Sequence, residues 1–311
     1  MRVSVVIPTL NRPAALSRAL ASVRGQRLPA GTRAEILVVD NSPDGNAEAL
    51  VTRFGAEAGG ALPVRYLAVP QPGVASARNA GIAAATGDWI AFIDDDEEAA
   101  HGWLAALIAV ARQGGADAVF GPVHAQAEGG AEIGAFAAYF SRRVCAADGA
   151  DVTDRAAYLG TNNSMFSAAA CASVAGPFEE RLNSIGGEDS LFLRRLVLSG
   201  HRFAWAAEAR ITEWVPPRRL TWTYVRRRRF LSGQIRTFVH EMAAPRRRLA
   251  VVRWMVVGAV QVVSSGALAL ALRPFHEAAS RRHLVTAWGG LGKVFWMARF
   301  RGSLYGTGLV S

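Results

Sequence analysis

The chain has 311 residues, of which 51% are hydrophobic and 19% charged, and its formal net charge is +10 at pH 7. This length and hydrophobic content exclude a disordered chain and allow one large α/β domain with an appendage, or two domains. The two cysteines, Cys145 and Cys171, form no CxxC pair, which excludes a disulfide framework or a cysteine-rich metal site and fits a reducing, cytosolic compartment.

Short apolar strands alternate with helical patterns in the N-terminal half. The apolar run at residues 3–7 turns polar by Thr9, so it predicts a first strand rather than a signal peptide. This alternation predicts βαβ units and a mostly parallel sheet with helices on both faces. Further strands are expected at residues 35–40, 64–69 and 89–93, and helices from Pro13 onward and at residues 73–86 and 103–115.

Polar side chains follow three of these strands. The first strand ends in PTLNR at residues 8–12, the second ends in Asp40 and Asn41, and residues 94–96 after the fourth strand are all aspartate. In an open parallel sheet, ligands bind outside the carboxyl ends of the strands. These three positions are therefore expected to line one site.

This site is expected to use a divalent cation, Mg²⁺ or Mn²⁺. The sequence at the site has neither a GxGxxG fingerprint nor a GxxxxGK[ST] loop to hold phosphates, so a metal must contribute more of that binding. Carboxylates at a strand end can link such a cation to substrate phosphates. An EF-hand is excluded, because its sixth and twelfth loop positions, counted from Asp94, are Ala99 and Ala105.

A second acidic pair, Glu188 and Asp189, lies further along the chain. It follows Gly186 and Gly187 and precedes a run with helical apolar spacing, which places both acids at a predicted helix N-terminus. One interpretation is a catalytic role, and the alternative is that both acids only cap the helix.

All of the net charge lies in the C-terminal third. Residues 218–253 hold 11 arginines and one acid, Glu241, and the rest of the chain is neutral. The next 19 residues, 254–272, carry no charge and approach the length of a membrane-spanning helix beside a basic flank. A second apolar stretch at residues 284–300 suits a helix in the membrane interface, and the alternative is a helical hairpin buried on the catalytic part.

Four blocks carry a resemblance to a known family. They read VSVVIPTLNRPAALSRALASVRGQ, ILVVDNS, GVASARNAGIAAATGDWIAFIDDDEE and GGEDSLFLRRL, in this order, over about 190 residues. Together they resemble the inverting family 2 glycosyltransferases of GT-A fold that build bacterial exopolysaccharides or lipid-linked saccharides. This implies an α/β catalytic domain at residues 1–217, with a donor half at 1–122 and an acceptor half at 123–217. Residues 218–311 would form a helical, membrane-associating extension.

The resemblance also implies a role for individual side chains. Asp40 would contact the nucleotide base, Asp94 and Asp95 would lie at the ribose and diphosphate, and Asp96 would be the metal ligand. The full donor set would be Pro8, Thr9, Asn11, Arg12, Asp40, Arg78, Asn79, Asp94 and Asp95. Asp189 would be the base that takes the acceptor's proton, with Glu188 bonding acceptor or backbone. The acceptor would be faced by Trp103, Asn162 and Asn163, although the two asparagines also suit a turn.

The expected activity is transfer of a sugar from a nucleoside-diphosphate sugar, with a UDP-sugar favoured, to a hydroxyl. The expected acceptor is a lipid-linked saccharide of polysaccharide or glycolipid synthesis at the cytoplasmic face of the membrane. One alternative is a nucleotide-sugar-binding protein of the same fold without transferase activity. Another is a nucleic-acid-binding protein acting through residues 226–229, which are all arginine; it is disfavoured because the first 217 residues hold no excess of basic residues.

Overall fold

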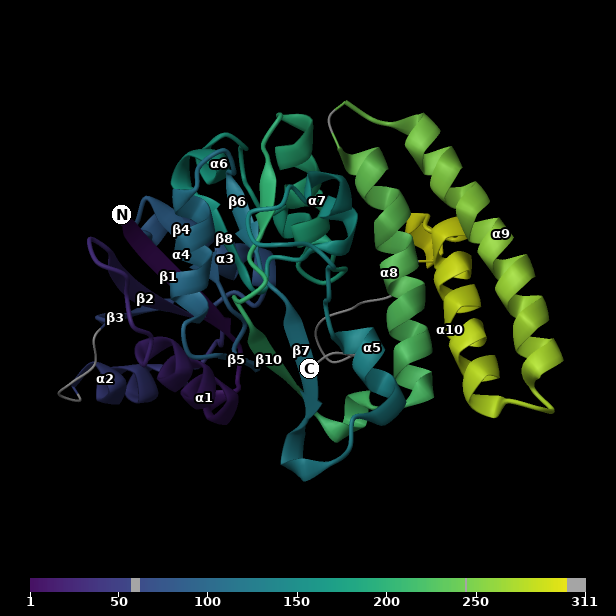
Figure 1. Cartoon of the computed structure of the whole chain (residues 1–311), viewed down its shortest axis with the longest axis horizontal. Coiled ribbons are helices and arrows are strands. Elements are labelled where there is room, and N and C mark those ends of the chain that lie inside the picture. The colour runs from purple at the N-terminus through teal and green to yellow at the C-terminus, as the bar shows by residue number, and fades with distance from the viewer. Residues whose placement is uncertain (57–61, 244, 301–311) are drawn as a thin grey trace.

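A seven-stranded sheet forms the centre of the molecule, and three long helices stand on one side of it (Figure 1). The computed structural model describes residues 1–56, 62–243 and 245–300, so residues 301–311 of the expected C-terminal region lie outside the described part. In spatial order the strands are β3 (Val64–Ala68), β2 (Arg33–Asp40), β1 (Arg2–Thr9), β4 (Trp89–Phe92), β8 (Ser164–Ser167), β6 (Ala118–Phe120) and β9 (Phe203–Trp205). A smaller sheet has the order β5 (Glu97–Ala99), β10 (Ile211–Val215) and β7 (Val123–Ala127).

The central sheet is mostly parallel, which confirms the prediction from the alternation of strands and helices. β1 pairs in parallel with both β2 and β4, β2 pairs in parallel with β3, and β6 with β9. Among the described strands of this sheet, β8 alone runs antiparallel to its neighbours, β4 and β6. Because β1 and β4 run side by side in the same direction, the segments that follow them leave the sheet at the same edge.

Helices cover both faces of the central sheet. The sheet therefore has one hydrophobic core on each face. Alternate side chains of β1 show this, because Val3, Val5 and Ile7 point into one core and Val6 points into the other. The first core is completed by α1 (Pro13–Arg24), α2 (Glu48–Ala56) and α4 (Trp103–Arg112), and the second by α3 (Val74–Ala84), α6 (Ala168–Ala172) and α7 (Glu188–Leu198). The sequence analysis anticipates these helices except α2 and α6.

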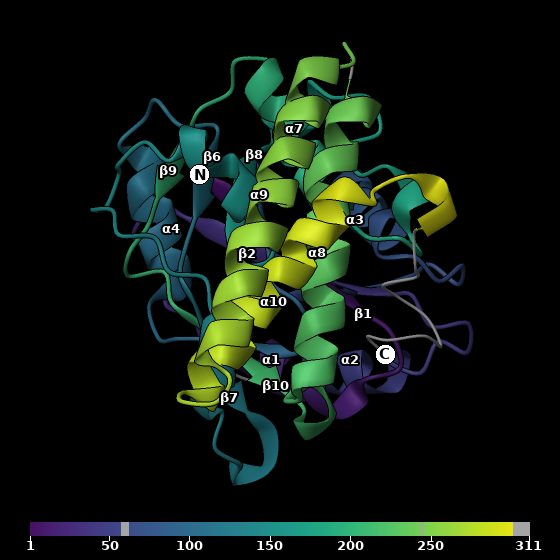
Figure 2. The same ribbon diagram turned by 90° about the vertical axis from the view of Figure 1, so that its right-hand side faces the viewer.

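The three C-terminal helices form a layer of their own. α8 (Trp222–Met242) lies against the α/β part, and α10 (Glu277–Val294) lies between α8 and α9 (Arg248–Leu272), as Figure 2 shows. The side chains of Phe238 and Val239 in α8 pack against Leu191 of α7. α10 buries Val285 and Ala287, so the predicted interfacial helix within residues 284–300 is instead packed between two other helices. A short helix, α5 (Ala137–Phe140), supports the other end of α8.

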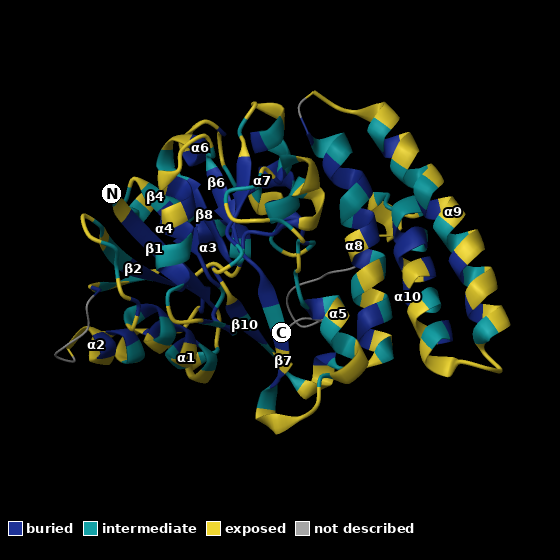
Figure 3. Ribbon diagram, in the orientation of Figure 1, coloured by how far each residue is buried: buried dark blue, intermediate teal, exposed yellow. Residues whose placement is uncertain are grey.

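α9 is apolar and largely uncovered. It has 25 residues with a mean hydropathy of 2.0 over its most apolar window, and 17% of that window is buried. Within the described residues it is the one helix long and apolar enough to cross a membrane. The alternative from the sequence, a helical hairpin buried on the catalytic part, is therefore wrong with respect to α9. The exposed stretches of α9 are visible in Figure 3. We define the outer face of α9 by its most exposed apolar side chains, Leu249, Val252, Val256, Val260, Val263 and Leu270.

Glycines let the three helices approach backbone to backbone. A Cβ atom on Gly292 of α10 would lie 1.9 Å from the carbonyl oxygen of Phe230 in α8. A Cβ atom on Gly258 of α9 would lie 2.6 Å from the carbonyl oxygen of Gly290 in α10. Both distances are shorter than any real contact of a Cβ atom, so these positions accept no side chain while the helices keep their spacing.

The Gly292→Ala variant should therefore be destabilised. Overpacking of this kind costs about 1–3 kcal/mol, and we expect the free energy of unfolding, measured by denaturant titration, to fall by that amount. Gly266→Ala in α9 is the matched control, because nothing lies within 4 Å of a Cβ atom there. That change should leave stability unchanged or raise it by up to about 1 kcal/mol. Equal effects of the two changes would contradict the close packing of α8 and α10.

Candidate active site

A cleft of about 470 Å³ opens at the carboxyl edge of the central sheet, where β1 and β4 end and α7 begins. This is the edge at which the strand-end argument places the site. The cleft is lined by ten of the residues that the sequence predicts to be functional: Pro8, Thr9, Arg12, Arg78, Asp94, Asp95, Asp96, Asn162, Glu188 and Asp189. The structure therefore brings both acidic clusters into one cleft, although they are far apart in the sequence.

Arg12 and Thr9 hold the first acidic cluster, residues 94–96, from the side of β1. The hydroxyl of Thr9 donates a hydrogen bond of 2.8 Å to Asp95, and Nη1 of Arg12 lies 3.2 Å from Asp95 and 3.1 Å from Asp96. Asp96 also lies 3.5 Å from Nη1 of Arg219. Burial and the nearby Asp96 raise the pKa of Asp95 to about 7. Burial and Asp94 raise the pKa of Asp96 as well.

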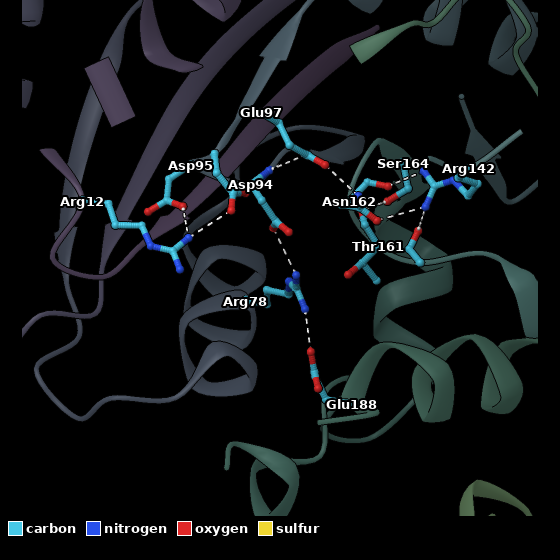
Figure 4. A network of polar contacts seen from close by, with 12 residues as sticks. Arg12, Arg78, Asp94, Asp95, Glu97, Arg142, Thr161, Asn162, Ser164 and Glu188 are labelled. Atoms are coloured by element: carbon cyan, nitrogen blue, oxygen red, sulfur yellow. Dashed lines mark hydrogen bonds and ion pairs between the residues drawn. The ribbon is translucent and has the colours of Figure 1, made fainter. Parts of the chain in front are cut away.

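Arg78 joins the two acidic clusters (Figure 4). Its Nη1 donates to Oε1 of Glu188 at 2.8 Å, and its Nη2 donates to Oδ1 of Asp94 at 3.1 Å. Glu188 is 1% exposed, and burial together with the neighbouring Asp189 raises its pKa to about 7, against the opposing effect of Arg78. Asp189 is less buried, and among its described contacts only Oδ1 accepts hydrogen bonds, from Ser190. Asp189 is thus the more exposed member of the pair.

A second chain of bonds runs from the first acidic cluster to Arg142 (Figure 4). Glu97 accepts the backbone N–H of Asp94 at 2.8 Å and the side-chain amide of Asn162 at 2.6 Å. Asn162 in turn accepts a bond of 3.0 Å from Arg142, which also donates to the carbonyl oxygens of Gly160 and Asn162. Burial lowers the pKa of Arg142 to about 10 and raises the pKa of Glu97 well above its usual value. Asn162 is thereby fixed at the cleft wall.

Asp40 lies outside the lining of the cleft. Its carboxylate is fully buried and accepts bonds from the backbone N–H groups of Ser42 and Ala47, both at 2.9 Å, and from the hydroxyl of Tyr66 at 3.1 Å. The structure therefore places Asp40 in the hydrogen-bond network of the loop after β2. Its neighbour Asn41 lines the cleft instead and donates to the carbonyl oxygens of the segment after β3.

Trp103 and Asn163 also lie outside the cleft. Both side chains are fully buried, and the indole N–H of Trp103 donates to Asn163 at 2.7 Å. The amide of Asn163 donates to the carbonyl oxygens of Pro122 and Ala209, at 2.8 and 2.7 Å. Asn163 has a φ of 50°, so of the two interpretations of this residue the structure shows the turn. The prediction that Trp103 and Asn163 contact the acceptor is not supported by these positions.

Asn11 and Asn79 take part in local bonds. Asn79 exchanges two hydrogen bonds with the backbone of Phe178, of 2.8 and 3.0 Å, and so ties α3 to the segment before α7. Asn11 has a φ of 55° in the turn after β1 and accepts a bond from Asn46. Neither residue is among those that line the cleft.

Sequence reasoning missed part of the lining. Besides Asn41, which is expected at the site as the end of the second strand, the additional polar residues at the cleft are Glu97, Asn183, Ser184, Glu213, Arg219 and Arg228. Glu97 follows the three aspartates directly, and Arg219 and Arg228 belong to the arginine-rich region. The sequence around each of these three residues could therefore have indicated a place at the site. Glu213 lies alone in β10, where nothing in the sequence marks it. Burial raises the pKa of Glu213 to about 7, with Arg228 acting in the opposite direction.

The residues at the end of β4 fit a hard divalent cation. Mg²⁺ and Mn²⁺ are commonly held by one or two carboxylates together with substrate phosphates, and Asp94 and Asp96 lie at the cleft wall where such phosphates would enter. Among the described residues no group of three or more acidic, histidine or cysteine side chains is arranged to hold a metal alone. The donor set therefore suits a cation that is shared with the substrate.

The buried acids predict how stability depends on pH. Between pH 4.5 and about 7 the folded protein keeps the proton of Glu213 while the unfolded chain has lost it. Without nucleotide or metal, the free energy of unfolding should therefore fall as the pH rises through this range. Denaturant titrations at several pH values should show a smaller fall for Glu213→Gln and an unchanged fall for the exposed control Glu132→Gln. A stability that rises with pH in both variants and in the parent would contradict the assignment.

Comparisons with known proteins identify the family of the chain. The sequence profile of Glycosyl transferase family 2 matches residues 4–148, and that of Glycosyl transferase family group 2 matches residues 89–298. The succinoglycan biosynthesis protein ExoM of Rhizobium meliloti is 30% identical over 234 residues, which cover 75% of this chain and 74% of ExoM. Glycosyltransferase AglE of Haloferax volcanii is 27% identical over 258 residues, which cover 82% of this chain and 80% of AglE.

The fold has solved counterparts. The structure of S. aureus TarS 1-349 in complex with UDP-GlcNAc superimposes with a TM-score of 0.54 at 16% identity and covers 94% of this chain and 90% of that one. At this identity the likeness concerns the fold, which agrees with the expected GT-A architecture. Together with the family profiles and the match to ExoM, it shows that the chain belongs to the family 2 glycosyltransferases and has their GT-A fold.

Proposed function

We propose that the protein transfers a sugar, with inversion at the anomeric carbon, from a nucleoside-diphosphate sugar to a hydroxyl of a saccharide. The observation that carries this proposal is the meeting of the two acidic clusters in one cleft through Arg78. A UDP-sugar is the favoured donor, and the crystallisation of TarS with UDP and with UDP-GlcNAc supports this choice. The name of ExoM supports a role in polysaccharide synthesis.

Asp189 is the proposed base. It lines the cleft, and its Oδ2 lies 3.3 Å from the position that a Cβ atom would take on Gly160, so a larger residue at position 160 would crowd this carboxylate. In the proposed reaction Asp189 takes the hydroxyl proton, the hydroxyl oxygen bonds to the anomeric carbon, and the bond from that carbon to the diphosphate breaks with its electrons. Glu188 is held by Arg78 and buried, which suits a residue that positions the start of α7.

The donor side is proposed to lie at Arg12, Arg219 and the aspartates after β4. A divalent cation bound at Asp96 would neutralise the charge that develops on the departing diphosphate. Arg12 and Arg219 lie within 3.1 and 3.5 Å of Asp96, so they hold the carboxylate in place from two sides. Thr9 and Arg12 fix Asp95 in the same way and keep it beside the cleft.

The proposed location is the cytoplasmic face of a membrane, with a lipid-linked saccharide as the acceptor. The uncovered outer face of α9 supports this proposal, because water does not favour an apolar surface of that extent. Arginines flank it at both ends, namely Arg247, Arg248 and Arg253 near its start and Arg273 after its end. Apolar side chains beside arginines suit an anionic bilayer surface.

The Asp189→Asn variant tests the proposed base. Loss of a general base lowers rates by roughly 10²- to 10⁴-fold, so sugar transfer should fall by that factor while the donor still binds. Transfer is measured with radiolabelled donor, and Asp154→Asn, at an exposed aspartate, is the matched control. Transfer by Asp189→Asn at the rate of the parent would rule out this role for Asp189.

Thermal shift identifies the donor and tests the metal. The purified protein is screened against UDP-, GDP-, TDP- and CMP-sugars with Mn²⁺ or with EDTA, beside Asp96→Ala. We expect one nucleotide class to raise the melting temperature only when both Mn²⁺ and Asp96 are present, because carboxylate and phosphates share the cation. Stabilisation that persists in EDTA and in Asp96→Ala would contradict the metal assignment while leaving the donor site intact.

Vesicle binding tests the proposed location. Co-sedimentation with vesicles of phosphatidylcholine and phosphatidylglycerol should capture the parent protein, and Val263→Asp should weaken that binding by about tenfold or more. Val263 is 74% exposed on the outer face of α9. Thr286→Asp, an exposed position on α10, introduces the same charge elsewhere and should leave binding unchanged. A parent protein that stays in the supernatant would exclude the membrane proposal.

A further inference from the structure

One row of side chains along α8 leads from the cleft toward the start of α9. Arg228, Ser232, Arg236 and His240 follow one another at intervals of four, so they are neighbours on the helix surface. Arg228 lines the cleft, and Arg236 lies about 12 Å further along the helix axis. Figure 1 shows α8 between the α/β part and the other two helices.

Arg236 lies between two aromatic rings from different parts of the chain. Its guanidinium carbon is 4.6 Å from the ring centre of Tyr158, in the segment before β8, and 5.4 Å from that of Trp254 in α9. The indole N–H of Trp254 donates to Nε2 of His240 at 3.0 Å. These contacts order the positive charge of Arg236 without neutralising it, because aromatic rings carry no net charge.

The surroundings of Arg236 and His240 contain an excess of positive charge. Arg194 of α7 and Arg247 and Arg253 near the start of α9 also act on His240, whose pKa is lowered to about 4 by burial and by these arginines. Among the described residues these arginines and Arg236 form no ion pair with an acid.

Three nitrogen atoms of this group, Arg194 Nε, Arg236 Nη1 and His240 Nδ1, are buried without a hydrogen-bond partner among the described residues. Buried donors of this kind are costly unless an acceptor reaches them. Charge and unused donors therefore both favour an anion with several oxygen atoms.

The group lies next to the proposed base. Tyr158 precedes Gly160 by two residues, which span at most about 7 Å of chain. A Cβ atom on Gly160 would lie 3.3 Å from Oδ2 of Asp189. Tyr158 is 67% exposed, and its ring offers an apolar face against which a sugar ring can pack. The acceptor hydroxyl at Asp189 and the positive group at Arg236 are thus within the reach of one molecule.

We propose that Tyr158, Arg236, His240 and Trp254 form an acceptor subsite that binds the phosphate group of a phosphorylated saccharide. This inference rests on the proposed function and names the chemical class of its acceptor. Arg236 supplies the charge, His240 and Arg236 supply N–H donors, and Tyr158 contacts the sugar next to the phosphate. A phospholipid headgroup offers the same phosphate chemistry, so the experiment separates the two sources.

Binding of soluble phosphates tests the subsite directly. The full chain is titrated with glucose 1-phosphate, with inorganic phosphate and with glucose, and binding is followed by calorimetry in EDTA so that a metal-dependent donor site takes no part. We expect both phosphates to bind and glucose alone to bind far more weakly. Arg236→Gln should weaken the binding of glucose 1-phosphate by about tenfold or more, because it removes a charge-assisted bond. Arg236→Lys, which keeps the charge, should retain part of the affinity.

Arg227→Gln is the matched control. Arg227 is an exposed arginine of the same helix outside the row, and its loss should leave phosphate binding unchanged. Equal weakening by Arg227→Gln and Arg236→Gln, or no binding of phosphate by the parent, would overturn the proposal. Circular dichroism of Arg236→Gln and Arg236→Lys shows whether each variant is folded, and the lysine variant carries the test if the glutamine variant is not.

Two further measurements identify the source of the bound phosphate and separate this proposal from the proposed function. Vesicles of phosphatidylcholine with and without phosphatidylglycerol are tested on the same variants, and a loss confined to anionic vesicles would identify a lipid headgroup as the ligand and overturn the saccharide assignment. Stabilisation by the nucleotide sugar with Mn²⁺ is measured in parallel. If that stabilisation persists in Arg236→Gln, failure of the subsite leaves the proposed glycosyl transfer unaffected.

Discussion

The contacts of Arg78 hold the cleft together. Its guanidinium is nearly buried and bonds to Asp94 after β4 and to Glu188 at the start of α7, so one side chain of α3 fixes two segments that are distant in the sequence. Seven carboxylates line the cleft, against four arginines. Without the arginines, mutual repulsion and loss of hydration would drive these acids apart or leave them protonated. Burial, with repulsion from neighbouring acids adding to it, raises the pKa of Asp95, Glu188 and Glu213 to about 7, so the protonated forms of these acids are favoured when no cation is bound.

Two regions of opposite charge follow one another along α8. On the side of the cleft, Arg228 faces the buried acids, and further along the same row Arg236 and His240 lie among other cations. The phosphate of the proposed acceptor would be repelled by the acids and attracted by the row, so the field along α8 would orient this acceptor with its phosphate away from the cleft. The hydroxyl end would then point to Asp189. Charge separation along one helix would thus set the direction in which the proposed acceptor binds.

The sequence predicted the central sheet and the place of the site, because apolar strands and the acids after them are local patterns. It also predicted ten residues of the cleft lining, among which Arg12 pairs with Asp96 and Arg78 pairs with Asp94 in the structure. It failed where an isolated polar residue gains its role from partners distant in the chain. Arg142 and Glu213 have no local pattern, and Asp40 and Asn163 have the residue type expected of a site but use their polar atoms to hold loops. The packing of α10 between α8 and α9 depends on glycines that a hydropathy pattern does not distinguish from other small residues.

The close backbone contacts of α10 have a mechanical consequence. Gly292 against Phe230 and Gly290 against Gly258 bring the backbones of α8, α10 and α9 close together at these positions, so we expect the three helices to move as one rigid layer. Phe238 of α8 packs against Leu191 of α7, so this layer of helices is joined to the α/β part beside the cleft. We therefore expect the distance between the cleft and the outer face of α9 to stay fixed. If the outer face of α9 rests on a bilayer, as proposed, this fixed distance would select acceptors by their length, because only an acceptor that spans it would bring its terminal hydroxyl to Asp189.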